Sequence, residues 1–173
     1  MKQPKLRIAE PSDLQSLIDI DNESSTLFEQ AGLHFELDDD HPFVQGEALR
    51  WSRAIDQGQV YVAMNSGGAS IGFAACNLVD HQPYLDQLSV ALDYMRQGIG
   101  TQLLMKVIEW SAEGPLWLTT YASIPWNQPF YERYGFVVVP EPSYGPELSE
   151  ILRQQRLVLP APEDRIAMVR YAD

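Results

Sequence analysis

Apolar and polar residues follow two different periods between residues 84 and 108. Alternating apolar residues predict a strand that ends near Leu92, and apolar residues at helical spacing predict a helix over residues 99–108. Gly98 and Gly100 lie at the junction of the two patterns. The stretch therefore predicts a strand, a glycine-containing loop and an amphipathic helix in direct succession.

The same two periods divide the rest of the chain into short elements. Ser12 and Gln15 have the capping-box spacing that opens a helix. Residues 65–68, Asn-Ser-Gly-Gly, are a strong turn signal between two strands. No repeat or long linker interrupts the chain, so we expect a single domain over residues 1–173. Further strands are expected over residues 6–9, 59–64, 69–78, 116–122 and 165–171, and further helices over residues 12–30, before residue 58 and over 147–156.

The glycine-containing loop has the features of a phosphate site. A helix that starts after a tight glycine turn exposes several backbone N–H groups at the positive end of its dipole, which suits a phosphate. Glycine turns are also common as simple connections, so the loop alone does not decide its use. Leu103 stands where a dinucleotide fingerprint needs a small residue, and no Gly-Lys-Ser/Thr triplet occurs. Those two phosphate-binding classes are therefore excluded.

The residues around this loop resemble the acyl-CoA-binding motif of the GNAT superfamily of N-acetyltransferases. In that motif a strand leads into Gln/Arg-x-x-Gly-x-Gly/Ala and then a helix, and the loop N–H groups hold the CoA pyrophosphate. Gly98 and Gly100 match the glycine positions, whereas Met95 replaces the usual Gln or Arg. Arg96 is placed to neutralise phosphate charge, although it could instead be an ordinary exposed loop residue.

A second motif follows at the distance that the family requires. Residues 124–139, IPWNQPFYERYGFVVV, resemble the family's Asn…Phe/Leu-Tyr-x-x-x-Gly-Phe element. The matching positions are Asn127, Phe130, Tyr131, Gly135 and Phe136. In the family the short helix of this element lies beside the pantetheine arm of CoA, and its tyrosine faces the thioester sulfur. The PWNxPFY form resembles a bacterial subgroup of these enzymes, although Asn127 could instead only cap the helix.

The resemblance implies transfer of an acetyl group from acetyl-CoA to a primary amine by direct attack on the thioester. Tyr131 is the expected acid that protonates the departing thiolate, and Asp86 is the candidate base. We place Asp86 on the strand with the side-chain parity of Leu88 and Val90, and a water relayed by a carboxylate is an equal alternative to direct proton abstraction. Tyr131 could instead be a packed aromatic and Asp86 a solvated strand residue. A non-catalytic acyl-CoA-binding sensor or scaffold module is the competing function.

The resemblance also implies a fold and a cofactor site. The expected fold is α+β, a twisted, mostly antiparallel mixed sheet flanked by helices, with a splayed central strand pair that binds CoA. Backbone N–H groups of residues 88–90 would polarise the thioester carbonyl where this pair splays. The expected cofactor-binding residues are Leu88, Ser89, Val90, Arg96, Gln97, Gly98, Ile99, Gly100, Thr101, Asn127 and Phe130.

Charge narrows the range of partners. The formal net charge of −12 disfavours nucleic acid, because phosphate contacts need a basic surface. It fits a cationic amine, and the acidic residues 38–40 could attract one or could simply form a solvated loop. No pattern indicates or excludes a homodimer.

The remaining composition favours a metal-free cytoplasmic enzyme. Cys76 is the single cysteine, which excludes an intrachain disulfide, and its apolar surroundings indicate a small buried hydrophobe. No HExxH motif or His/Cys cluster occurs, so we expect no metal. The chain contains no apolar run of membrane-spanning length and no apolar signal core near its start, so we expect neither a membrane partner nor export.

Overall fold

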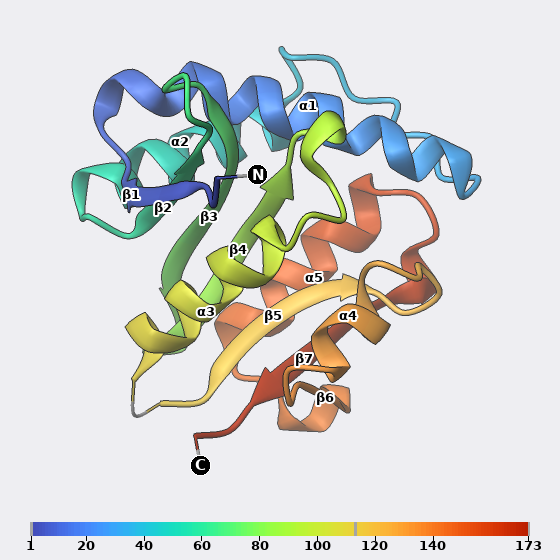
Figure 1. Ribbon diagram of the computed structural model, residues 1–173. Coiled ribbons are helices and arrows are strands. Elements are labelled where there is room, and N and C mark those ends of the chain that lie inside the picture. The colour runs from blue at the N-terminus through green and yellow to red at the C-terminus, as the bar shows by residue number, and fades with distance from the viewer. Residues whose placement is uncertain (1, 113, 173) are drawn as a thin grey trace.

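A computed structural model describes residues 2–112 and 114–172, which fold around one seven-stranded sheet (Figure 1). The strand order is β1-β2-β3-β4-β5-β7-β6, and every neighbouring pair is antiparallel except the parallel pair β4 and β5. The strands are β1 (Lys5–Ile8), β2 (Val60–Met64), β3 (Ser70–Val79), β4 (Gln82–Val90), β5 (Leu116–Tyr121), β6 (Val137–Val139) and β7 (Arg165–Arg170). This mixed sheet with flanking helices confirms the expected α+β fold class.

Helices cover both faces of the sheet. Ala74 and Cys76 of β3 pack with α3, whereas the alternate residues Phe73 and Ala75 pack with α1 and α2, because successive side chains of a strand point to opposite faces. Figure 1 shows α3 and α4 in front of the sheet and α5 behind it. Within the described ranges, none of the helices has the length and apolar character needed to cross a membrane. The helices are α1 (Leu14–Gln30), α2 (Pro42–Asp56), α3 (Ile99–Ser111), α4 (Gln128–Glu132) and α5 (Pro146–Val158).

Two tight turns join the three strands that lead to the centre of the sheet. The predicted turn between β2 and β3 forms, and the Asn65 side-chain oxygen accepts hydrogen bonds from the N–H groups of Gly67 and Ala69, both at 3.0 Å. A second turn, between β3 and β4, places Asp80 and His81 in the left-handed region with φ of 50° and 62°. The sequence patterns did not single out this second turn, since neither residue is a glycine.

The central strand β4 contains a β-bulge that corrects the expected side-chain parity. Leu85 pairs with Cys76 and Gln87 pairs with Ala75, so Asp86 is an extra residue in β4. Leu88 packs into the core under α3, as Leu85 does, whereas Asp86 binds a residue of α2 on the opposite face. Asp86 therefore does not share the face of Leu88, because the bulge shifts the alternation by one residue.

Beyond the bulge, β4 and its parallel neighbour β5 separate. Their ladder consists of two paired positions, Tyr84 with Trp117 and Leu85 with Leu118, although both strands continue further. This confirms the expected splayed central pair. The predicted strand also ends earlier than the pattern indicated, because Leu92 begins a 3-10 turn over Leu92–Tyr94.

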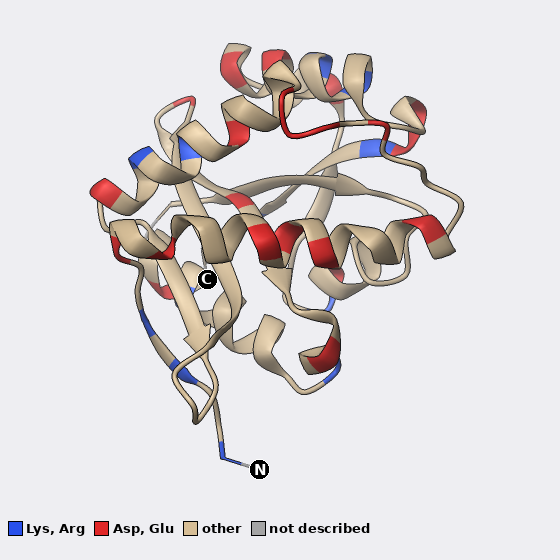
Figure 2. Cartoon of the chain, turned by 90° about the horizontal axis from the view of Figure 1, so that it is seen from above, with Lys and Arg blue, Asp and Glu red and all other residues tan. Residues whose placement is uncertain are grey.

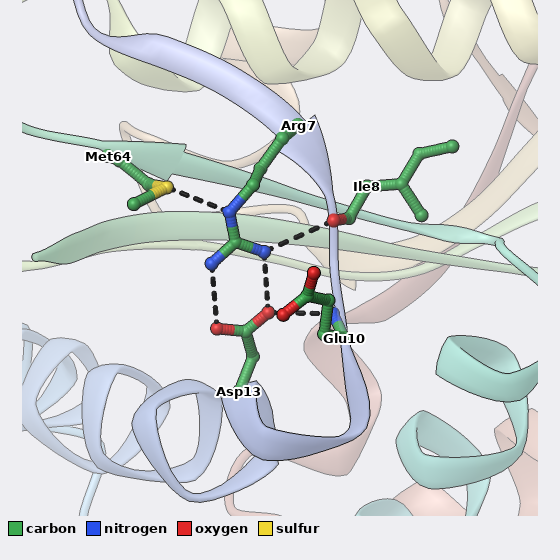
Figure 3. Close-up of polar contacts among 5 residues, drawn as sticks. All are labelled: Arg7, Ile8, Glu10, Asp13 and Met64. Carbon is green, nitrogen blue, oxygen red and sulfur yellow. Dashed lines mark hydrogen bonds and ion pairs between the residues drawn. The ribbon is translucent and has the colours of Figure 1, made fainter. Parts of the chain in front are cut away.

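The start of α1 is held by an ion pair and not by the predicted Ser12–Gln15 box. Arg7 of β1 donates to both carboxylate oxygens of Asp13, at 2.7 and 3.0 Å, and Asp13 also accepts from the N–H of Glu10 at 2.7 Å (Figure 3). The hydrogen bond from Arg7 lowers the pKa of Asp13. Gln15 instead donates to Asp19 one turn further along α1. The ion pair between Arg7 and Asp13 thus joins β1 to the start of α1.

Candidate active site

A cavity of about 1140 Å³ opens where β4 and β5 separate. It reaches from the Gly98 loop (residues 95–98), which precedes α3, to α1 and α2. The structure places every predicted site residue on its lining except Gln97 and Ile99. The predicted residues on the lining are Asp86, Leu88, Ser89, Val90, Arg96, Gly98, Gly100, Thr101, Asn127, Phe130 and Tyr131.

The first turn of α3, directly after the Gly98 loop, contains unbonded backbone donors. Gly98 has φ of +81° and forms the N-cap of α3, a conformation that glycine adopts at little cost. In the part of the chain that the structure describes, the N–H groups of Ile99, Gly100 and Thr101 donate to no carbonyl group. Unbonded donors at the positive end of a 13-residue helix suit an anion.

The side chains of Arg96, Gln97 and Ile99 lie in different surroundings. Arg96 is exposed and lies at the cavity, where its charge can reach an anion. Gln97 donates to the carbonyl oxygen of Asp93 at 3.1 Å and stabilises the loop, and the Ile99 side chain is buried in the core under α3. Gln97 and Ile99 can therefore contact a ligand in the cavity through their backbone atoms only.

Tyr131 of α4 lies on the lining of the cavity that opens between β4 and β5. Its ring packs edge-to-face against Phe130 and Phe136, with ring centroids 5.1 and 5.5 Å away. Burial raises the pKa of Tyr131, which keeps the hydroxyl protonated. Among the described residues, no group lies within hydrogen-bond distance of this hydroxyl. The phenol is thus a packed aromatic that also retains an unused proton donor.

Some of the neighbouring polar side chains form hydrogen bonds within the protein, and the Asn127 side chain makes no capping hydrogen bond. Tyr134 shares a hydrogen bond of 2.8 Å with Thr101, and the Tyr121 hydroxyl donates to the Pro160 carbonyl oxygen at 2.8 Å. Asn127 occupies the N-cap position of α4, but its side chain makes no capping hydrogen bond. The amide of Asn127 is therefore available to a ligand in the cavity.

An ion pair crosses the cavity between β4 and α2. Arg50 donates through Nε and Nη2 to the two carboxylate oxygens of Asp86, at 3.0 and 3.1 Å. The Asp86 side chain is 9% exposed. The structure thus does not place Asp86 as a solvated strand residue, and both of its oxygens are already occupied by a guanidinium.

Two further carboxyl groups lie beside this pair. Asp21 of α1 accepts hydrogen bonds from Gln87 and Ser89 of β4, both at 2.9 Å. Burial raises the pKa of Asp21 to about 6, against the effect of its hydrogen bond from Ser89. Burial, followed by the nearby charge of Asp21, raises the pKa of Glu47 to about 8. The cavity therefore contains two carboxyl groups that can exchange protons near neutral pH.

The sequence analysis missed both of these carboxyl groups. Asp21 lies four residues after Leu17, and Glu47 lies four residues before Trp51, and both apolar partners are buried. Residues four apart share one face of a helix, so each carboxylate interrupts a buried apolar stripe. An acidic residue in such a stripe is costly to bury and is a useful signal for a functional site.

The acidic character extends outward from the cavity. Figure 2 shows acidic positions recurring along α1 and along the loop that leads into α2. Asp39, in the predicted acidic loop, is exposed and lies at the rim of the cavity. One end of the cavity is thus suited to an anion and the other end carries mainly carboxylates.

Comparison with known proteins gives matches over most of the chain. Residues 56–138 match a family described as an acetyltransferase (GNAT) domain. The chain is 32% identical over 139 residues to YafP of Escherichia coli K12, an uncharacterized N-acetyltransferase, and the match covers 80% of this chain and 85% of that protein.

Solved structures show the same fold. A GNAT-family acetyltransferase from Staphylococcus aureus Mu50 superposes with a TM-score of 0.72 at 19% identity, covering 96% of this chain and 98% of that one. PaiA N-acetyltransferase from Thermoplasma acidophilum, solved in complex with coenzyme A, superposes with a TM-score of 0.67 at 17% identity, covering 99% and 100% of the two chains.

Proposed function

The chain belongs to the GNAT family of acetyltransferases, and we propose that it transfers an acetyl group from acetyl-CoA to a primary amine by direct attack. The observation that carries this proposal is the opening between β4 and β5, which has paired residues at two positions only. Unbonded N–H groups of the first turn of α3 lie at one end of this opening, and the half-buried carboxyl groups of Asp21 and Glu47 lie at the other. An acyl-CoA and an amine can thus reach the same point from opposite sides.

The Gly98 loop fits the pyrophosphate of CoA. Its N–H groups and the positive end of α3 supply the donors, and Arg96 adds a positive charge. The acyl-carrying arm would then lie along the unpaired edge of β4 at Leu88–Val90, beside Asn127 and Phe130. The backbone donors of β4 at this edge would polarise the thioester carbonyl.

Tyr131 supplies the proton that the departing thiolate requires. The amine nitrogen forms a bond to the carbonyl carbon, the bond from that carbon to sulfur breaks, and the thiolate takes a proton from the phenol. A thiol is a stronger acid than a phenol, so the tyrosinate formed must be reprotonated after the step. The Tyr131 hydroxyl suits this role because it donates to none of the described residues.

The proton lost by the amine goes to the carboxyl groups on the other side of the opening. Glu47 is best suited as the acceptor, because Asp21 already accepts hydrogen bonds from Gln87 and Ser89, whereas the pKa of Glu47 is raised to about 8, near the operating pH. Asp86, the base expected from the sequence, has both oxygens bonded to Arg50. We assign Asp86 to holding Arg50 in place, with Glu47 or a water beside it taking the proton.

Calorimetric titration with acetyl-CoA tests the cofactor site first. We expect the protein to bind acetyl-CoA, and a Gly98→Ala/Gly100→Val variant to lose that binding. An alanine would be strained at the φ of +81° of Gly98, and a side chain at Gly100 would fill the space in front of Val90 and Phe130. Gly68→Ala is the matched control, because Gly68 has φ of +87° but lies in the β2–β3 turn away from the cavity.

The titration tests cofactor binding independently of amine turnover. Binding that survives in the Gly68→Ala control and disappears in the double variant would support the site and justify a screen of amines. No binding by the intact, folded protein would remove the basis of the proposed reaction. Binding without turnover of any amine would instead favour a sensor or scaffold module.

A further inference from the structure

A buried arginine faces the acceptor side of the cavity. Arg165, the first residue of β7, is 8% exposed and lies on the cavity lining. Its Nη2 donates to Thr119 at 3.1 Å and to Gln155 of α5 at 2.8 Å, and its guanidinium stacks on the Tyr121 ring at 4.5 Å. The guanidinium is therefore held in a defined orientation by three neutral groups.

Among the residues that the structure describes, Arg165 has no anionic partner in direct contact. In the described part of the chain, Arg165 forms no ion pair, and its buried Nε has no hydrogen-bond partner. A guanidinium stays protonated in proteins, and burying it without an opposite charge is costly. Burial lowers the pKa of Arg165, which reflects the same cost. An arginine retained under these conditions has an unused capacity for an anionic group.

Two carboxyl groups, Asp21 and Glu47, line the same cavity as Arg165. Glu47 and Arg165 act on each other electrostatically, but they do not form an ion pair. Arg50 is already neutralised by Asp86. Among the described residues of the lining, the groups without an ion pair thus include the guanidinium of Arg165 on β7 and the carboxyl groups of Asp21 on α1 and Glu47 on α2.

We propose that the acceptor is a small amino acid, with its carboxylate bound by Arg165 and its amino group held between Asp21 and Glu47. This inference rests on the proposed function, because it names the substrate class of the same site. A planar guanidinium matches a carboxylate through parallel N–H donors. A simple cationic amine would leave Arg165 without an anion and would place two positive charges in one cavity.

An acceptor panel tests the proposal directly. Each standard amino acid is compared with its carboxamide and with the amine that lacks the carboxyl group, and the release of CoA thiol is followed. We expect kcat/KM for the preferred amino acid to exceed that of both analogues by about tenfold or more, the usual size of a hydrogen bond to a charged group. The amino group of the carboxamide is less basic than that of the amino acid, so a larger fraction of it is unprotonated and able to react. A preference for the amino acid over its carboxamide would therefore oppose this difference in reactivity.

Gln155→Glu tests the role of Arg165 without removing it. The new carboxylate keeps the shape of the side chain that accepts from Arg165 at 2.8 Å, and it supplies the missing negative charge from within the protein. We expect this variant to lose the preference for the amino acid over its amide by about tenfold, with acetyl-CoA affinity unchanged. Gln154→Glu is the matched control, since it adds the same charge at the adjacent, exposed position of α5.

The outcomes distinguish failure of the substrate class from failure of the function. Equal or better turnover of the amides or decarboxylated amines would overturn the amino acid proposal while leaving acetyl transfer intact. An unchanged preference in a folded Gln155→Glu protein would also overturn it. If that variant does not fold, Arg165→Lys replaces it, and it is expected to reduce the same preference because a lysine lacks the planar donor pair. Acetylation of no amine at all would remove the proposed function and this inference together.

Discussion

The ring of Tyr131 packs in the core, whereas its hydroxyl takes no part in that packing. The ring packs against Phe130 and Phe136 and is 8% exposed, so removing it would disturb α4. The hydroxyl has no hydrogen-bond partner among the described residues. A substitution that deletes only the oxygen therefore tests chemistry with little effect on packing.

We expect Tyr131→Phe to lower kcat by about 10²- to 10⁴-fold, the usual contribution of a positioned acid, with the Kd for acetyl-CoA nearly unchanged. Steady-state kinetics and calorimetry on the same preparation measure the two quantities. Tyr134→Phe is the control, since it deletes a neighbouring hydroxyl that is bonded to Thr101. An unchanged kcat in Tyr131→Phe would show that this phenol is not the acid.

At the scale of single elements, the distance between β3 and α3 sets the position of the Gly98 loop. A β-carbon at Gly72 of β3 would lie 3.1 Å from the Ser89 carbonyl oxygen and 3.2 Å from Leu103 Cδ1. Gly72 thus allows α3 to approach the sheet closely, and α3 begins at the Gly98 loop. Gly72 thus affects the position of the first turn of α3, although Gly72 does not line the cavity.

Gly72→Ala is expected to lower the free energy of unfolding by about 1–3 kcal/mol, the usual cost of overpacking a core. Urea denaturation measures this change, with an unaltered m-value as the sign that the unfolded state is the same. Gly46→Ala, inside α2 with open space around it, is the contrasting variant and should raise stability by about 0.5–1 kcal/mol. A stable Gly72→Ala protein would mean that α3 can move away from the sheet.

At the scale of the whole molecule, the net charge of −12 makes every buried carboxylate harder to ionise. Burial first, and then the charge of Asp21, raises the pKa of Glu47 from its ordinary 4.5 to about 8. Between these two values the folded protein binds a proton that the unfolded chain has lost. The free energy of unfolding therefore decreases as the pH rises through this window.

Glu47→Gln removes this dependence, so the variant should gain stability relative to the parent protein as the pH rises from about 4.5 to about 8. Urea midpoints at pH 5, 7 and 9, approximately spanning that window, provide the measurement. Glu23→Gln, at an exposed position of α1 outside the cavity, is the control for the change in net charge. A constant difference between Glu47→Gln and the parent at all three pH values would contradict the raised pKa.

The sequence by itself determined the local features of this protein. Gly98 and Gly100 predicted a tight turn that opens a helix, and this turn is present, because turns and helix starts depend on residues close together in the chain. Phosphate binding at this helix start and the acid role of Tyr131 stay predictions. The alternation of apolar residues predicted most strands, and the order of the two motifs predicted the fold class. The expected pairing of residues 65–68 as a turn was confirmed for the same reason.

Only the tertiary structure decided the acceptor side of the cavity. Arg50 and Asp86 are 36 positions apart, and Ser89 and Asp21 are 68 positions apart. Their pairing requires the bulge at Asp86, which shifts the side-chain alternation and is not visible in the apolar pattern. Glu47 of α2 and Arg165 of β7 likewise line one cavity only because the fold brings α2, β7 and α5 together. Burial and ion pairing depend on how distant elements pack, and this is why the sequence pointed to the Gly98 loop but not to Asp21, Glu47 and Arg165.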